Sequence, residues 1–301
     1  MDSLAPMDGS GRRRFTRFLK PLAGLAAAAV VAAAATSCGS EKGAESLSAE
    51  TLADVADRTV GKGSARISVE LQMEGLPGLD QPLVITGESL AELSGRRQRS
   101  EMDFPLLLLG DEGAGDRTQP VLLVVDRPIV HMNMPFLSEA LQSPTAWIRM
   151  DLENLPPGAE DLQSLATGQN DPSQAINYLR GATGDLRRLG EAEVRGVATT
   201  QYRGTVDLDL AAQRAPEDVR ESVEASRSEV ESQIGTTKLP ANVWIDQDGV
   251  VRRVRYEYPL PANPEAQIVF TADLSDFGIK VDVAPPPPDQ VTNLEDLAPA
   301  E

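Results

Sequence analysis

Cys38 is the only cysteine in this chain of 301 residues, so no intramolecular disulfide can hold the fold together. A domain without such staples depends on a hydrophobic core. The stretch from Ser48 to Val283 contains about 235 residues, which is long enough to bury one. The sequence therefore predicts one core-stabilised domain over 48–283, preceded by a short N-terminal segment and followed by a tail.

A basic cluster, an apolar run and a small-residue site precede Cys38. Five basic residues lie between Arg12 and Lys20, and the apolar run extends from Leu22 to Ala35. This three-part layout is that of a secretory signal. A helix that spans a membrane needs about 20 strongly apolar residues. Because this run is shorter and mostly alanine, a permanent transmembrane helix is the weaker interpretation.

The Ala-Thr-Ser sequence immediately before Cys38 resembles the lipobox of bacterial lipoproteins, although leucine is usual at the first of these three positions. The resemblance implies a signal peptide over 1–37, a lipidated Cys38 that carries acyl chains such as palmitate, and a tether over 38–47. Two acyl chains suffice for stable anchoring. We therefore expect a protein anchored at the extracellular face of the cell membrane. The alternative is an ordinary cleaved signal with an incidental cysteine.

The charge of the chain limits its partners. Removal of 1–37 takes away five of the 28 basic and two of the 46 acidic residues, which leaves a net charge of −21. Such a chain repels the phosphates of nucleic acids and anionic lipid head groups. We expect no nucleic-acid partner and a body that stands off the membrane on its tether.

Capping residues and apolar spacing predict three helices. The first begins after Ser48 and ends at Gly61. The second begins at Asp171, with proline at its first position. The third runs from about Pro216 to Ile234 and carries a narrow apolar stripe, which is typical of a surface helix.

Most of the remaining sequence alternates between apolar and polar residues and predicts about ten strands. Turn residues at 126–128 and 247–249 indicate hairpins. No regular alternation of strands and helices is visible, so the pattern favours an α+β fold, a large antiparallel sheet with a few helices on one face. Four prolines, Pro285 to Pro288, and the acidic residues after them predict a disordered tail over 284–301.

Two stretches carry a family resemblance: 190–208 (GEAEVRGVATTQYRGTVDL) and 239–256 (LPANVWIDQDGVVRRVRY). They are similar to the mycobacterial LprG- and LppX-type lipoproteins and their actinobacterial relatives, whose fold resembles that of LolA and LolB. The resemblance implies a curved antiparallel half-barrel sheet with a few helices packed on its concave face. It also implies a cavity between sheet and helices that holds acyl chains, and a lipid or glycolipid ligand.

The most apolar stretch of the domain runs from Phe104 to Gly110. One interpretation places its leucines in the wall of a lipid cavity; the alternative is the buried end of a strand. The candidate wall residues are Leu106, Leu107, Leu108, Leu109, Phe136 and Leu137.

The residues for catalysis or metal binding are scarce. The single histidine, His131, stands in an expected strand, where we expect a structural role. A catalytic histidine normally needs a nucleophile and an orienting carboxylate, and a zinc site needs about three protein ligands. Asp246 to Gly249 contains a fragment of a calcium loop, but strand residues resume at once, so a hairpin turn is favoured. We expect no enzyme activity, no cofactor and no metal; the sequence specifies no protein partner.

Two functions remain open on these grounds. The first is a membrane-anchored envelope lipoprotein that binds or transfers lipid acyl chains in an apolar cavity, by partition from water or membrane. The second is a non-catalytic extracellular interaction module on the same fold, with its interior filled by side chains.

Overall fold

The computed structural model describes residues 46–75, 81–109, 117–156, 173–260, 263 and 266–297. Within this part of the chain, thirteen strands form one sheet in the order β1-β8-β9-β10-β11-β12-β2-β3-β4-β5-β6-β7-β13. Neighbouring strands pair antiparallel except β13 and β7, which are parallel. The strands are β1 (Ser46–Leu47), β2 (Ser64–Glu74), β3 (Leu83–Glu92), β4 (Arg97–Pro105), β5 (Thr118–Asp126), β6 (Ile129–Asn133), β7 (Trp147–Asp151), β8 (Leu186–Val194), β9 (Val197–Asp207), β10 (Lys238–Asp246), β11 (Val251–Pro259), β12 (Gln267–Ser275) and β13 (Val291–Asn293).

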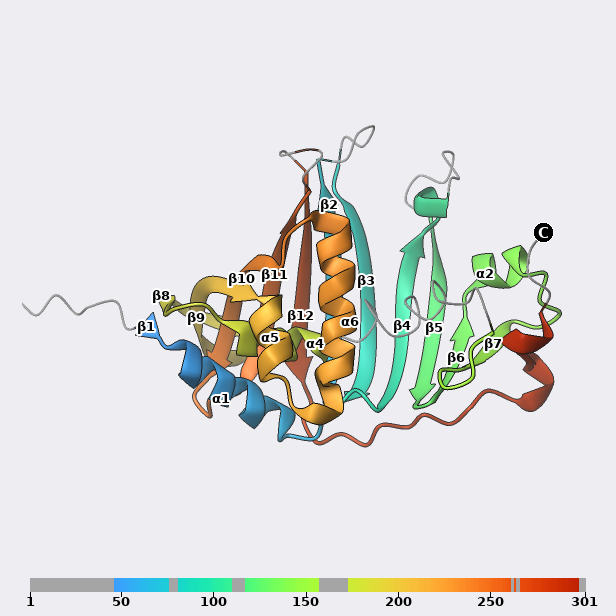
Figure 1. The fold of residues 1–301 in the computed structure, drawn as a ribbon, viewed down its shortest axis with the longest axis horizontal. Helices are drawn as coiled ribbons and strands as arrows, with labels where there is room; N and C mark the ends of the chain where they lie inside the picture. The colour runs from blue at the N-terminus through green and yellow to red at the C-terminus, as the bar shows by residue number, and fades with distance from the viewer. Residues whose placement is uncertain are drawn as a thin grey trace, which may run out of the picture. The chain divides into compact units, whose positions relative to one another are not determined.

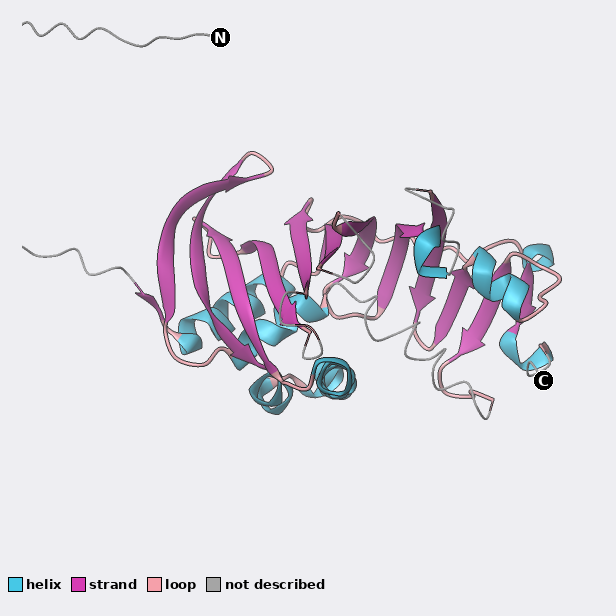
Figure 2. Cartoon of the chain, turned by 90° about the horizontal axis from the view of Figure 1, so that it is seen from above, coloured by secondary structure: helices cyan, strands magenta, loops and turns pink. Residues whose placement is uncertain are grey.

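Helices α1, α4, α5 and α6 all lie on one face of the sheet, over the strands from β9 to β2 (Figure 1), and the view from above shows the outer strands curving around them (Figure 2). The short helix α2 lies beside β6 and β7 at the other end. The predicted fold class, a curved and largely antiparallel sheet with a few helices on its concave face, is therefore confirmed. The helices are α1 (Ala49–Val60), α2 (Pro135–Ala140), α4 (Gln174–Tyr178), α5 (Leu208–Arg214) and α6 (Glu217–Ile234).

The expected helix signals act as predicted. The Ser48 hydroxyl accepts a hydrogen bond from the Thr51 amide at 3.1 Å and caps α1, which ends before Gly61. Helix α6 ends at Gly235, whose φ of 69° is the left-handed conformation that glycine adopts without strain. Helix α4 begins at Gln174; the two residues expected to start it, 171 and 172, lie outside the described residues.

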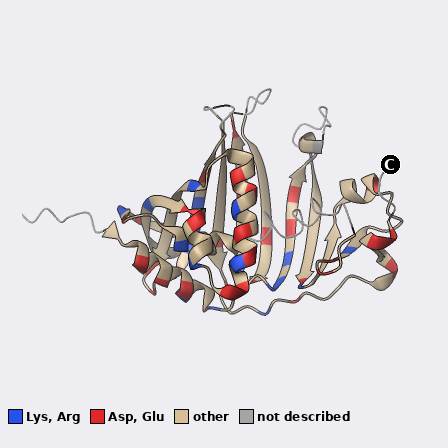
Figure 3. Ribbon diagram, viewed as in Figure 1, with Lys and Arg blue, Asp and Glu red and all other residues tan. Residues whose placement is uncertain are grey.

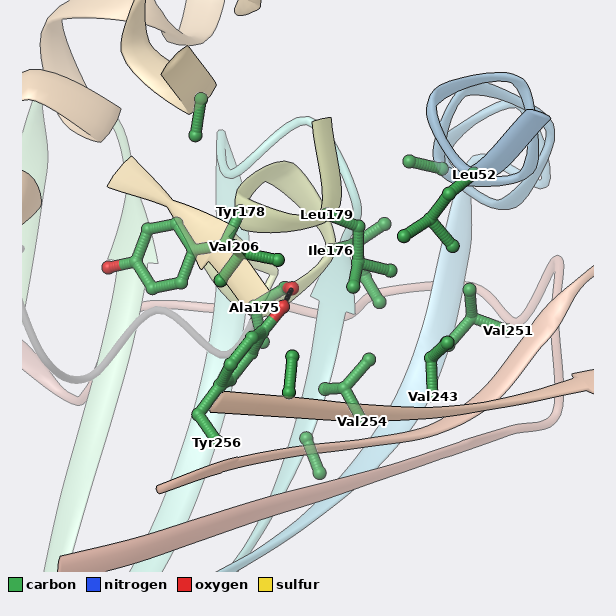
Figure 4. Close-up of a cluster of buried hydrophobic side chains, with 14 of the residues drawn as sticks. Leu52, Ala175, Ile176, Tyr178, Leu179, Val206, Val243, Val251, Val254 and Tyr256 are labelled. Atoms are coloured by element: carbon green, nitrogen blue, oxygen red, sulfur yellow. Dashed lines mark hydrogen bonds between the residues drawn. The ribbon is translucent and has the colours of Figure 1, made fainter. Parts of the chain in front are cut away.

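The helix-covered half of the sheet, β9 to β12 and β2, shares one core with its helices. Figure 4 shows Leu52 of α1, Ile176 of α4 and Leu179 of the 3₁₀ turn that follows α4. All three point at valines of β10 and β11. All three side chains are fully buried. The Tyr256 hydroxyl donates to the Ala175 carbonyl at 2.6 Å and ties β11 to α4. Burial raises the pKa of Tyr256 well above its usual value, so this hydroxyl stays protonated and remains a donor.

The far half of the sheet, β4 to β7, buries the same face against shorter elements. Its core is a methionine cluster, which contains Met132, Met134 and Met150 and has Met102 packed against it. It also contains buried residues of β5, β6 and β7, the α2 residue Leu137, and Leu294, which lies after β13. The thioether side chain is unbranched and adapts to irregular gaps.

The chain ends differ from the expectation. Ser46 and Leu47, expected as tether, form β1 and pair with Leu186 and Arg187 of β8. The segment from 284 to 297 is not a disordered tail: it follows the lower ends of the strands in Figure 1 and pairs as β13 with β7. Its four prolines, 285 to 288, still exclude a regular strand where they stand. After β13 the Leu294 side chain is buried, with 6% of its surface exposed. The composition of 284–301 predicted a segment with little to bury, but burial of the Leu294 side chain in the methionine cluster holds it against the sheet.

Candidate functional site

One apolar face runs across the whole sheet on the side of the helices. Its residues can be followed through the register of the strands, since alternate residues of a strand share a face. Leu71 of β2 lies between Ile85 of β3 and Phe270 of β12. Met73 lies between Leu83 and Ile268 in the same way. We call the following set the apolar band: Leu71, Met73, Leu83, Ile85, Met102, Phe104, Ile268 and Phe270.

The apolar band differs from the rest of this face in its exposure. Every member except Ile85 is half-buried, whereas Ala65 and Ile67, nearer the start of β2, have no exposed surface. Half-buried apolar side chains retain part of the free energy that further burial would release, about 25 cal/mol per Å². The band is therefore the part of the face that can gain most by covering with another apolar group.

The apolar band is continuous with the methionine cluster. The Phe104 ring stacks on the ring of Phe136 in α2, with 5.6 Å between the centroids. Met102 lies across the glycine of the next strand: a Cβ on Gly87 would lie 2.6 Å from the Met102 Cγ. A side chain at position 87 would have to displace this methionine. Glycine therefore leaves room for the Met102 side chain to lie over β3.

A short polar row interrupts the apolar face between the two halves. Ser89 of β3 and Ser100 of β4 are joined through their hydroxyls at 2.7 Å, and the Gln98 amide nitrogen donates to the Ser100 hydroxyl at 2.5 Å. All three side chains are at most 5% exposed. Because buried polar groups are costly unless they are hydrogen-bonded, the row is a stable boundary rather than an exposed polar surface.

The candidate wall residues do not come together as one wall. Leu106 to Leu109 form a 3₁₀ turn after β4, in which Leu106 and Leu107 are half-buried and Leu108 is 39% exposed. The Leu109 side chain lies outside the described residues. Phe136 and Leu137 instead pack in the methionine cluster, with Leu137 8% exposed. Their role in binding a ligand stays a prediction.

Two surface hollows in the described part of the chain are the most developed, and neither of these two includes a candidate wall residue. One of about 470 Å³ lies on the outside of α6, along Glu217 to Ser228. The other, of about 450 Å³, lies between the end of α1 and the segment 279–281, with Glu92 and Arg97 in its wall. Between the helices and the sheet the described side chains are packed against one another (Figure 4).

The remaining candidates for chemistry occupy structural positions. His131 lies in β6 opposite Arg149; burial first, and the Arg149 charge second, lower the pKa of His131, which favours neutral imidazole at pH 7. The Asp246 carboxylate accepts the amides of Asp248 and Val250 at 3.0 and 2.9 Å, so the calcium-loop fragment is the predicted hairpin turn. The described residues contain no group of three or more acidic, histidine or cysteine side chains that could hold a metal.

The predicted signal segment and the predicted anchor, Cys38, lie outside the described residues, which begin at Ser46. Lipidation of Cys38 therefore stays a prediction. Among the helices that the structure describes, none combines the length and the apolar character needed to cross a membrane.

Comparison with known proteins gives remote similarities. No family model matches the chain. A curated relative from Streptomyces griseus, named as an uncharacterized 31.2 kDa protein in the rplA-rplJ intergenic region, is 25% identical over 155 residues; the chain spans about half of its length, 49%. Among solved structures, LprF from Mycobacterium bovis is 13% identical at a TM-score of 0.42, covering 80% of this chain and 99% of that one. The lipoprotein LppX from Mycobacterium tuberculosis is 16% identical at a TM-score of 0.41, covering 78% and 99%.

Proposed function

We propose that this chain is a lipid-anchored protein of the cell envelope that binds lipid acyl chains on the apolar band of its sheet. The half-burial of the band is the observation that carries the proposal. An acyl chain laid across β12, β2, β3 and β4 would cover side chains that face water in part, and each CH₂ removed from water contributes about 0.8 kcal/mol. Binding of this kind is partition, with no covalent step.

The methionine cluster supplies a wall that can adjust. Met102 and Phe104 belong to the apolar band and also pack against the methionine cluster. Methionine has three rotatable side-chain bonds and tolerates rearrangement, so an acyl chain can extend from the band toward β5 and β6 without unfolding the sheet. The polar row at Ser89 and Ser100 is buried and hydrogen-bonded within itself, so it bounds this path and does not bind the ligand.

Cys38 supports the location. The lipobox resemblance makes it the attachment point of acyl chains, and the chain from Cys38 to Ser46 is short enough to keep the sheet near the membrane from which a ligand comes. Transfer of the ligand to another protein is the further step that such a position would allow.

The decisive experiment compares two neighbouring residues of β3 that face opposite sides of the sheet. Leu83 belongs to the apolar band, whereas Val84 is 41% exposed on the other side. The full chain and its Leu83→Asp and Val84→Asp variants are exposed to envelope lipids and studied by native mass spectrometry. We expect bound lipid with the parent and with Val84→Asp, and loss of bound lipid with Leu83→Asp at an unchanged circular dichroism spectrum. Equal lipid loading of both variants contradicts the proposal.

A second pair of substitutions separates flexibility from area. Met132→Leu and Met150→Leu preserve volume and cost less than about 1.5 kcal/mol, but they stiffen the methionine cluster. If the cluster adjusts to the ligand, the double variant binds fewer long-chain lipids while short-chain lipids still bind.

The filled core of the helix-covered half favours a second function. Because side chains occupy the space between helices and sheet, the chain also fits a non-catalytic interaction module. Failure to bind any lipid, together with a stable protein partner recovered on the anchored chain, would favour that function over acyl binding.

A further inference from the structure

A row of arginines crosses the sheet on the face opposite the helices. Arg187 of β8 pairs with Arg203 of β9, and Asn242 of β10 lies between Arg203 and Arg255 of β11. The neighbours of these arginines, Leu186, Tyr202 and Tyr256, belong to the helix-side core. Because successive residues of a strand point to opposite faces, the three guanidinium groups point away from the helices. We call Arg187, Arg203 and Arg255 the basic row.

The charge of the basic row is only partly neutralised by carboxylates. Like charges directly opposite one another on paired strands destabilise a sheet, and a single carboxylate, Glu257, lies near two of these arginines. Its oxygens are 3.5 Å from the Arg203 Nη2 and 3.9 Å from the Arg255 Nε. The Arg255 Nε is buried and has no hydrogen-bond partner. Arg187 forms no ion pair with any described residue.

An exposed apolar side chain accompanies these cations. Leu189, two residues after Arg187, lies at the irregularity between Arg188 and Gly190 where the pairing of β8 with β9 shifts register, and it is 42% exposed, one of three large apolar side chains with such exposure among the described residues. Cations next to an exposed leucine match a membrane surface, where phosphates lie beside the start of the acyl layer.

Helix α6, on the other side of the sheet, is mainly acidic. Helix α6 carries acidic residues along its length and the strands from β8 to β11 carry basic ones (Figure 3). Along the basic row itself, the positions beyond Arg255 are Thr271, Glu70, Thr86 and Asp103. At this level of the sheet the basic residues of β8 to β11 therefore give way to uncharged and acidic residues from β12 to β4, and an anionic surface would attract the β8 to β11 end and repel helix α6.

The tether reaches the fold at the same end. Ser46 of β1 pairs with Arg187. The eight residue-to-residue steps from Cys38 to Ser46 span less than about 30 Å when the chain is fully extended. If Cys38 is the anchor, Arg187 is held within this distance of the lipid surface, and the effective concentration of phosphates around it is high.

We propose that the basic row, with Leu189, binds the phosphate groups of anionic phospholipids at the bilayer surface and holds the helix face of the protein away from the membrane. The orientation rests on the proposed anchor at Cys38, but the binding does not. The site therefore attracts the membrane locally, although the net charge of the chain opposes it.

Vesicle flotation of the full chain with Cys38→Ser tests the binding without the anchor. The vesicles contain phosphatidylcholine alone or phosphatidylcholine with one third phosphatidylglycerol. We expect association with the anionic vesicles only, weakened by salt. Arg187→Gln with Arg203→Gln should weaken it roughly 30-fold, from the contribution of each basic side chain near such a surface. Leu189→Ser should weaken it further.

The matched control removes the same charge elsewhere on the sheet. Arg96, in the turn before β4, and Arg99 of β4 are exposed, and their side chains form no hydrogen bond or ion pair with the described residues. Arg96→Gln with Arg99→Gln should therefore bind as the parent does. Equal binding of the two double variants overturns the proposal, as does equal binding to neutral vesicles. Inorganic phosphate that binds the row while vesicles do not assigns the site to a soluble anion and overturns it as well.

Acyl loading, followed by native mass spectrometry on the same samples, keeps the two proposals apart. If the Cys38→Ser parent does not associate with anionic vesicles but still binds acyl chains, the proposal for the basic row is rejected and the proposed function is not. Loss of acyl loading with vesicle association intact rejects the proposed function alone.

Discussion

In the helix-covered half of the sheet four helices close over the apolar face, whereas in the far half the same face is closed by α2 and the segment that contains Leu294. The two cores also differ in composition. Among the described residues, the buried core of the helix-covered half contains aliphatic side chains and two tyrosines, while Met132, Met134 and Met150 are buried in the far half.

The difference in composition implies that the side chains of the helix-covered half pack in one arrangement, whereas those of the far half can pack in several. Branched and aromatic side chains in close packing specify a single set of rotamers, and Tyr256 adds a directed hydrogen bond. Methionines pack nearly as well but in more ways. We infer that the helix-covered half supplies stability and that the far half, with the apolar band beside it, supplies adaptability.

The largest expected effect tests this division directly. Tyr256→Ala removes a fully buried ring and should lower the free energy of unfolding by about 3–5 kcal/mol. Met132→Ala, which is equally buried, should cost less because its flexible neighbours can relax. Urea denaturation of both variants measures the difference. A greater loss for Met132→Ala would contradict the division, and Tyr256→Phe, which leaves the ring, reports the hydrogen bond alone.

The next effect concerns what closes the far half. Leu294→Ala should lower the free energy of unfolding by about 2–3 kcal/mol, because its side chain is buried among residues of β5 to β7. Its neighbour Glu295 is exposed, so Glu295→Ala should change stability by less than about 0.5 kcal/mol. Thermal unfolding compares the two. Equal stability of both variants would mean that the segment after 284 does not pack.

A smaller effect is expected at the cap of α1. Ser48→Ala removes the acceptor of the Thr51 amide and should cost about 1 kcal/mol. Hydrogen exchange should increase in α1 and remain unchanged in β5 to β7, since the helix belongs to the other half. Increased exchange in both halves would show that the two cores unfold as one unit.

The smallest effect is the pH dependence from His131 in the far half. Its pKa in the folded protein lies below the unfolded value of about 6.5, so the unfolded chain binds the proton more readily. Its contribution to stability is present above pH 6.5 and is lost as the pH falls from this value through the lower pKa of the folded state. Denaturation at about pH 7.5 and pH 5.5 should show a smaller decrease in His131→Gln than in the parent. An identical decrease would assign the dependence to other groups.

The sequence predicted the helix-covered half better than the far half for a physical reason. Helix α1 has a serine cap, a periodic apolar face and a closing glycine, all within 49–61 and its flanks, and α6 is signalled as locally. In the far half the covering elements are a helix of six residues and a strand of three. Elements this short carry too few residues for a periodic pattern to stand out.

The apolar band and the place of the last segment depend on contacts between distant parts of the chain. Alternation along 65–73 predicted which residues of β2 share a face, but not that β12 would lie beside it. Leu294 looks like a solvated residue of an acidic tail until β13 is paired with β7. Phe136 and Leu137 were grouped with the leucines of 106–109 by apolar character, whereas pairing of β6 with β7 assigns them to the methionine cluster.

The first and last strands of the sheet order, β1 and β13, come from the two ends of the described chain. Each of these short ribbons shields the unpaired amides and carbonyls of a longer strand, which would otherwise offer a template to another molecule. Proteolytic removal of β1 or β13, or a fusion partner that pulls β13 away, would therefore do more than shorten the protein. It would expose an unpaired strand edge that can pair with the sheet of a second copy. Intact ends are in this sense a safeguard against aggregation.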